Sequence, residues 1–196
     1  ASEVGIMTTL TDLARNSAPR NVAGDIGKLF GEAIAKKMDQ DLLAKFDGFS
    51  TAVGTDSAAL TPAVIFNAAS TLRALGLPVD ETYCVLHPKV AFDLKSGLTN
   101  TFAGLSTDLS NEALRSGFIG QIAGIKIFET GNMANTGTGG MFHKDALGLA
   151  MMQDIKIETQ RDASLRADEI VATAVYGVGE LHDSYGVEVL ADSSIL

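Results

Sequence analysis

The stretch YCVLHPKVAFDLKSG brings together a thiol, an imidazole, an amine and a carboxylate, at Cys84, His87, Lys89 and Asp93. Such a set could supply the nucleophile and the base of a hydrolase. Side chains alternate between the two faces of a strand, so Cys84 and His87 cannot reach each other within this segment. We therefore predict that Cys84 is a small core residue and that His87 caps the following helix. Lys89 and Asp93 are four apart and are predicted to pair on the surface of that helix.

Two other histidines could approach Cys84 through the fold. A small α/β hydrolase, with Cys84 as nucleophile and His143 or His182 as base, is therefore an alternative reading. The three histidines lack the spacing of a metal site, and no acidic pair stands beside one as HExxH would require. The residues predict no catalytic group, no cofactor site and no metal site.

A glycine-rich run, Gly137 to Gly140, invites comparison with a phosphate-binding loop. Such a loop needs a helix start directly after it, so that backbone amides and the helix dipole meet the anion. The residues that follow are Met141 and Phe142, which favour a strand. We predict a hairpin here instead of a phosphate site.

The first half of the chain predicts mainly helices. Apolar residues recur at spacings of three and four from Asp25 to Phe46, with Asp25 as the cap and Gly48 after the end. Thr61 and Pro62 are predicted to cap and begin a second helix. The remaining predictions here are an extended or helical lead-in over 1–24, a loop with one short strand over 47–60, a strand over 83–86, a short helix over 88–95 and a surface loop over 98–117.

The last third predicts strands. Residues 155–159 alternate between apolar and polar side chains, as in a half-buried antiparallel strand. Residues 169–178 are apolar on both faces and predict a central strand. Further strands are predicted over 122–129, 140–143 and 187–190. Arg161, Asp162, Arg166, Asp168 and Glu169 lie at a junction between strands, where they form either surface ion pairs or a contact between subunits.

Length, composition and net charge limit the classes of protein to which this chain could belong. The 196 residues suit one domain or one body with an inserted lobe, and 46% apolar with 20% charged residues is globular. One cysteine cannot form an internal disulfide. The net charge of −9, with only Lys36 and Lys37 adjacent, argues against a protein that grips nucleic acid. We expect no membrane span and no signal peptide.

The order of the segments resembles a known family. A long helix and a capped helix precede Leu86-His87-Pro88 to Leu94, then Gly120 to Thr130 with Asn132 and Met133, and finally Arg166 to Val178 within RADEIVATAVYGV. This order is similar to that of the major capsid proteins of tailed bacteriophages, which have the Hong Kong 97-type fold. The resemblance implies an α+β fold with a long spine helix, a peripheral domain and an axial domain.

The resemblance also implies a layout and a function. It assigns 1–52 to the lead-in and spine helix of the peripheral domain, 53–150 to the axial domain, 151–181 to the peripheral strands and 182–196 to a return into the axial domain. The implied function is a subunit of an icosahedral virion, assembled in the host cytoplasm into hexamers and pentamers around double-stranded DNA, without sequence-specific contact. Scaffolding, portal and decoration proteins are implied partners. An encapsulin-like compartment shell is the alternative, and the 24 residues before the spine helix cannot hold both the arm and the extended loop of the family.

Candidate interface residues follow from this comparison. At 100° per residue, small side chains form a stripe along the long helix. Glycine inside a helix costs about 1 kcal/mol relative to alanine. The stripe is therefore either simply tolerated, or it serves close approach or bending of the spine helix. The full set of candidate assembly residues is Gly27, Gly31, Ala35, Asn100, Phe102, Arg161 and Arg166.

Overall fold

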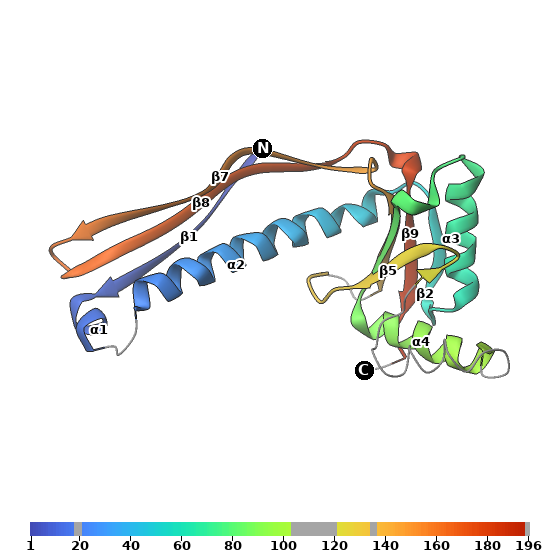
Figure 1. Cartoon of the computed structure of the whole chain (residues 1–196), viewed down its shortest axis with the longest axis horizontal. Helices are drawn as coiled ribbons and strands as arrows, with labels where there is room; N and C mark the ends of the chain where they lie inside the picture. The colour runs from blue at the N-terminus through green and yellow to red at the C-terminus, as the bar shows by residue number, and fades with distance from the viewer. Residues whose placement is uncertain (18–20, 103–120, 134–136, 195–196) are drawn as a thin grey trace. The chain divides into compact units, whose positions relative to one another are not determined.

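The structure is a computed structural model that describes residues 1–17, 21–102, 121–133 and 137–194; the side chains of Val79 and of 98–102 lie outside the description. The chain divides into two compact units (Figure 1). Unit 1 comprises Ala1–Asp41 and Leu149–Val178, and unit 2 comprises Leu42–Gly148 and Gly179–Leu196. Each unit is therefore built from segments that are distant in the sequence.

Unit 1 contains a three-stranded sheet in the order β1-β8-β7. β1 (Ser2–Thr11) runs antiparallel to β8 (Ala167–Glu180), and β7 (Leu147–Asp162) lies on the other side of β8. A short helix, α1 (Asp12–Ser17), follows β1. The lead-in thus contains both predicted conformations, and the prediction of a central strand over 169–178 is confirmed.

The long helix α2 (Val22–Leu43) packs its apolar side against this sheet. Phe30 and Ile34, one turn apart, are its buried residues, and they join Ile170, Ala172, Ala174 and Tyr176 of β8 in one core. The predicted helix is confirmed, but it begins at Val22 and ends at Leu43, each three residues earlier than predicted. Asp25 is not the cap, because the side-chain oxygen of Asn21 accepts the N–H of Gly24 at 3.3 Å.

Unit 2 contains a six-stranded mixed sheet in the order β2-β9-β6-β3-β5-β4. β9 is parallel to β2 and antiparallel to β6, and β3 is antiparallel to β6 and parallel to β5. The strands are β2 (Ala52–Ala59), β3 (Thr82–Leu86), β4 (Gln121–Ile122), β5 (Ile125–Glu129), β6 (Thr138–His143) and β9 (Gly186–Asp192). Three 3-10 turns, η1 (Ala44–Gly48), η2 (Val79–Glu81) and η3 (Asp183–Tyr185), complete the described part of the chain.

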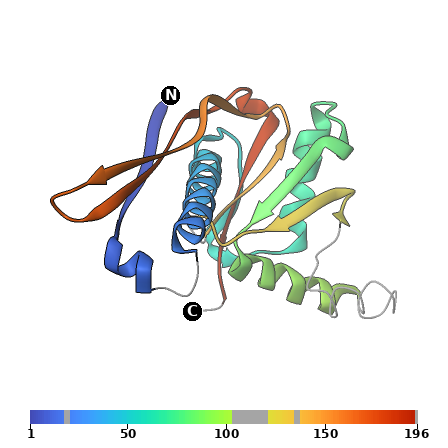
Figure 2. The ribbon, with the colours of Figure 1, turned by 60° about the vertical axis from the view of Figure 1, so that its left-hand side comes forward.

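Two helices cover one face of the six-stranded sheet (Figure 2). α3 (Pro62–Ala74) and α4 (Pro88–Phe102) share a core with strand residues such as Cys84, Met141 and Val189. On the opposite face, Phe46 and Phe49 form a second cluster with residues of the sheet that include Val85 and Phe142. Because side chains alternate along β3 and β6, these two strands contribute residues to two separate cores, one on each face of the sheet.

Two helix predictions need correction. α4 runs to Phe102, although Gly97 was predicted to end it and 98–117 to form a loop. The helix continues through Gly97, where an added Cβ atom would lie in ordinary contact with Pro62 at 3.4 Å, so this glycine is not a stop signal. Residues 103–117 of the predicted loop lie outside the described residues. Thr61 precedes α3 as predicted, but its side chain makes no capping hydrogen bond.

Three strand predictions also differ from the structure. The predicted hairpin over the glycine run is wrong, because the strands on either side of it, β5 and β6, do not pair and β3 lies between them. The predicted strand over 122–129 is interrupted at Ala123 and Gly124, which adopt positive φ angles of 54° and 76° and turn β4 into β5. Residues 52–59 form a full strand where a loop with one short strand was predicted.

Candidate assembly interface

The reactive residues of the stretch YCVLHPKVAFDLKSG have structural roles. Cys84 is fully buried in β3, and burial raises the pKa of its thiol to about 12. Its neighbour on β6 is Met141, whereas His143 lies opposite Thr82. A thiol with this pKa is not the thiolate that nucleophilic catalysis requires. Cys84 is therefore a core residue, as predicted.

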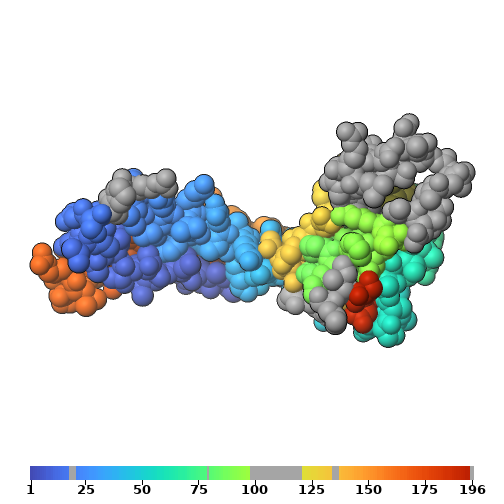
Figure 3. All heavy atoms as spheres, turned by 90° about the horizontal axis from the view of Figure 1, so that it is seen from below, coloured from blue at the N-terminus to red at the C-terminus, as the bar shows by residue number. Residues whose placement is uncertain are grey.

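The residues after Cys84 organise the start of α4. Nδ1 of His87 accepts the N–H of Lys89 at 3.3 Å, which confirms the predicted cap. The predicted ion pair between Lys89 and Asp93 is wrong. Asp93 is buried, and its carboxylate accepts the backbone N–H of Ser194 at 2.9 Å and the hydroxyl of the same residue. Asp93 thereby fastens the C-terminal segment, red in Figure 3, to the green helix α4.

The described residues were compared with the requirements of a metal site and of a membrane-spanning helix. Within the described residues, no group of three or more His, Cys, Asp or Glu side chains could hold a metal ion. None of the helices in the described part of the chain has the length and apolarity needed to cross a membrane.

The stripe of small residues on α2 lies beside the buried side of the helix. A Cβ atom at Gly27 would lie 3.8 Å from Cδ1 of Ile157, which is ordinary contact, and one at Gly31 would meet nothing within 4 Å. Ala35 is exposed. Close packing within the chain therefore does not require glycine at either position, and both interpretations of the stripe remain predictions.

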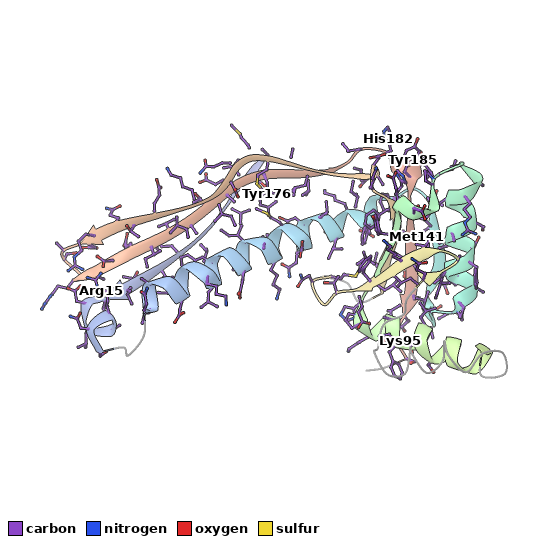
Figure 4. All side chains as sticks on the ribbon, in the orientation of Figure 1. Arg15, Lys95, Met141, Tyr176, His182 and Tyr185 are labelled. Carbon is purple, nitrogen blue, oxygen red and sulfur yellow. The ribbon has the colours of Figure 1, made fainter. Side chains whose placement is uncertain are left out.

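Arg161 lies at the centre of an ion-pair network in unit 1. Its guanidinium donates two hydrogen bonds of 2.7 Å to the carboxylate of Asp12 and one of 3.1 Å to Asp168. Arg15, labelled in Figure 4, donates to Asp168 at 2.6 Å. The hydrogen bond from Arg161 lowers the pKa of Asp12. The surface ion pairs predicted for this junction are confirmed at Arg161, although Asp12 and Arg15 are too distant in sequence for the pattern to show them.

Arg166 stabilises the turn between β7 and β8 through its backbone. It adopts a positive φ of 52° where the chain turns from β7 into β8, and its carbonyl oxygen accepts the N–H of Asp12 at 3.0 Å. Asp162 shapes the same turn by accepting the N–H of Ser164 at 2.8 Å and its hydroxyl at 2.6 Å. The exposed Arg166 side chain thus stands on a well-defined turn. The two remaining candidates, Asn100 and Phe102, lie in α4, and their side chains are outside the described residues.

Sequence reasoning missed the polar contacts of Asp41 and the burial of Glu188. The hydroxyl of Tyr176, which is labelled in Figure 4, donates to Asp41 at 2.7 Å, and the exposed Lys37 pairs with the same carboxylate at 2.7 Å. Glu188 is buried in β9; burial raises the pKa of its carboxyl group, and Asp47 and Asp56 raise it further. The sequence around Glu188, an apolar run, does not reveal that Asp47 and Asp56 lie near its carboxyl group in the fold.

Comparison with known proteins identifies the fold. The model of the phage capsid protein family matches residues 2–189. A search of curated proteins finds no match. A chain in the solved structure of Mycobacterium phage Che8 is 25% identical, with a TM-score of 0.79 over 96% of this chain and 70% of that chain. The capsid structure of the cyanophage P-SCSP1u gives 20% identity and a TM-score of 0.77 over 98% and 72%.

An encapsulin shares the same architecture. The SrpI encapsulin from Synechococcus elongatus has a TM-score of 0.77 over 100% of this chain and 75% of that chain, at 10% identity. That likeness shows the fold alone. The α+β architecture is the Hong Kong 97-type fold, and since the family model covers nearly all of the sequence, the chain belongs to the phage capsid protein family.

Proposed function

We propose that this chain is the repeating structural subunit of an icosahedral phage head and that its copies assemble into hexamers and pentamers around double-stranded DNA. The observation that carries the proposal is the family match over residues 2–189. The match of the whole fold to the solved phage structures supports it. The proposal assigns the chain a structural role, and the burial of Cys84 argues against the alternative of a cysteine hydrolase.

The two units take different places in the proposed shell. Unit 1, with α2 as the spine helix, corresponds to the peripheral domain, and unit 2 corresponds to the axial domain near the capsomer axis. The element order supports this assignment, because the long helix α2 precedes strands β2 to β6 of the six-stranded sheet, the long strands β7 and β8 follow them, and β9 then returns to that sheet. The proposed assembly residues remain Gly27, Gly31, Ala35, Asn100, Phe102 and Arg166. Arg161 is also one of them, in addition to its ion pair with Asp12 within the chain.

The charge of the chain suits a container for DNA. A net charge of −9 at neutral pH keeps the subunit from adhering to a polyanion, so enclosure needs no sequence-specific contact. Scaffolding, portal and decoration proteins are the further partners that we propose, with assembly in the host cytoplasm. An encapsulin-like compartment would use the same fold around a protein cargo.

Electron microscopy of the purified full-length chain tests the proposal. We expect closed shells, or capsomers with five and six subunits, because large interfaces between identical subunits carry the stability of such assemblies. Nuclease-protected DNA in particles from infected cells would support a phage head, and a protein cargo without DNA would support the compartment. A compact monomer at all concentrations, in the presence of scaffolding protein, would exclude both.

A further inference from the structure

His143, the last residue of β6, is a buried side chain whose hydrogen bonds are incomplete. The residue is 4% exposed. Nδ1 accepts the backbone N–H of Asp145 at 3.3 Å, so this nitrogen carries no proton, and the ring is neutral with its proton on Nε2. Nε2 makes no hydrogen bond with any residue that the structure describes. A buried donor without an acceptor costs free energy and is rare in folded proteins, so this arrangement calls for an explanation.

Two carboxylates flank the ring of His143. Oε2 of Glu81 lies 3.3 Å from Nε2, and Oδ2 of Asp145 lies 3.5 Å from Nδ1. The first contact lacks the geometry of a hydrogen bond, and the second sets two hydrogen-bond acceptors against each other. Lys144 donates to the other oxygen of Glu81 at 2.5 Å, and this hydrogen bond lowers the pKa of Glu81, which is therefore ionised wherever histidine titrates. A protonated ring would meet an anionic oxygen at each of its nitrogens.

The other neighbours of the ring are aromatic or uncharged, or bind elsewhere. Tyr185 of η3 lies edge-on to His143, with ring centroids 6.0 Å apart, and the exposed His182 contacts Tyr185 at 4.9 Å; both are labelled in Figure 4. The carboxylate of Asp183 accepts a backbone N–H from another segment at 2.8 Å. β3 places the uncharged Thr82 opposite His143. The charge balance at the ring nitrogens thus favours a cation.

The turn that follows His143 connects several segments of unit 2. The carbonyl oxygen of His143 accepts the N–H of Ala146 at 2.9 Å, and that of Ala146 accepts the N–H of Leu181 at 2.8 Å. The N–H of Lys144 donates to the carbonyl oxygen of Glu81 at 3.1 Å. A change in the backbone of this turn is therefore passed on to η2 and to the residues that precede η3.

We propose that His143 is a proton-operated switch in the turn between β6 and β7. In the neutral ring, Nδ1 holds the backbone N–H of Asp145. On protonation Nδ1 becomes a donor, so it releases that N–H and turns to the carboxylate of Asp145, while Nε2 pairs with Glu81. Histidine changes its charge between about pH 5 and 8, so mild acid operates the switch. The switch lies within one subunit and goes beyond the proposed function.

His87 provides a matched comparison within the same chain. Its Nδ1 also accepts the backbone N–H of the second residue after it, Lys89, at the same distance of 3.3 Å. The charged neighbour is a cation in this case: burial lowers the pKa of His87, and the charge of Lys89 lowers it further. We therefore expect mild acid to change the turn at Asp145 and to leave the cap at Lys89 in place.

Hydrogen exchange of the full-length chain at about pH 8 and about pH 5.5 tests the switch, with mass spectrometry of short peptides to resolve the two amides. After correction for intrinsic exchange rates, protection of the Asp145 amide should fall about fivefold in acid, as expected when one hydrogen bond of ordinary strength is lost. Protection of the Lys89 amide should not change. In His143→Asn the side-chain oxygen still accepts the N–H but cannot be protonated, so protection of Asp145 should become independent of pH.

Constant protection of the Asp145 amide in the wild-type protein would overturn the inference, and so would a fall that persists in His143→Asn. If that variant does not fold, the two amides of the wild-type protein decide the question, because equal falls at Asp145 and Lys89 contradict a switch at His143. The proposed function is tested separately by particle formation, so it stands whichever result is found.

Discussion

At the scale of single residues, Gly140 shows how a packing requirement can resemble a binding motif. A Cβ atom at this position would lie 2.6 Å from the ring of Phe46, and one at Gly139 would lie 2.6 Å from Leu86. The glycine run that invited comparison with a phosphate loop therefore makes room for side chains on both faces of β6. The sequence could not reveal this, because Phe46 is almost a hundred positions away.

Replacing Gly140 tests this packing directly. We expect Gly140→Ala to destabilise the protein by roughly 1–3 kcal/mol, because the added methyl group must displace an aromatic ring in a filled core. Thermal and denaturant unfolding of the purified variant would measure the change. Gly179→Ala is the control, since a Cβ atom there meets nothing within 4 Å. An unchanged unfolding midpoint for Gly140→Ala would contradict the predicted contact.

The buried carboxyl of Glu188 predicts a dependence of stability on pH. Burial and the neighbouring acids Asp47 and Asp56 raise its pKa above the ordinary value of 4.5. The folded state therefore binds this proton more tightly than the unfolded state, so stability is lost as the pH rises from about 4.5 through the folded pKa. Because glutamine cannot ionise, Glu188→Gln should raise the melting temperature at pH 7 by a few degrees and have little effect at pH 4.

Exposed Glu32 on α2 supplies the control for that measurement. Glu32→Gln changes the net charge by the same amount but removes no buried carboxyl group. We expect its melting temperature to follow the wild-type protein across the pH range. A parallel rise for both variants would assign the effect to net charge and not to Glu188.

At the scale of elements, sequence patterns located most helices and strands but misplaced some of their ends. The period of α2 and the apolar run of β8 are strong local signals, and both elements are present in the structure with ends that differ from the predicted ones by two or three residues. The helix α4 continues past Gly97, the residue that the local signal predicted as its end. β2 carries mostly small and polar residues, and it becomes a strand because β9 lies beside it. Tertiary packing therefore overrides local preference at these positions.

The stripe on α2 yields a prediction at the same scale. Because a Cβ atom at Gly31 meets nothing within 4 Å, Gly31→Ala should leave the fold intact and stabilise the subunit by up to about 1 kcal/mol through helix propensity. If the stripe serves assembly, Gly31→Ala and especially Gly31→Leu should impair particle formation or expansion while circular dichroism stays unchanged. Normal, fully expanded particles from the leucine variant would favour the simpler interpretation that glycine is tolerated here.

At the scale of the whole molecule, each unit has its own core although its segments are interleaved in the sequence. Unit 1 is built around Phe30, Ile34 and Tyr176, and unit 2 around residues such as Leu72, Cys84 and Leu94. Periodicity could predict the elements but not this division, since β8 joins β1 across more than a hundred and fifty positions. The order of motifs, by resemblance to a family, supplied the architecture that local patterns could not.

Separate cores predict separate responses to core mutations. Ile34→Ala in unit 1 and Leu72→Ala in unit 2 each remove a side chain that is at most 2% exposed, and each should cost about 2–5 kcal/mol. Local opening follows the contacts that hold a region together, so hydrogen exchange should quicken mainly in the unit that carries the substitution. Mass spectrometry of exchanged peptides would resolve the two patterns: 1–41 and 149–178 for Ile34→Ala, and 42–148 with 179–196 for Leu72→Ala. The two variants control for each other, because they delete similar volumes from different cores. Equal acceleration throughout the chain in both variants would show that the units open as one cooperative body, contrary to this expectation.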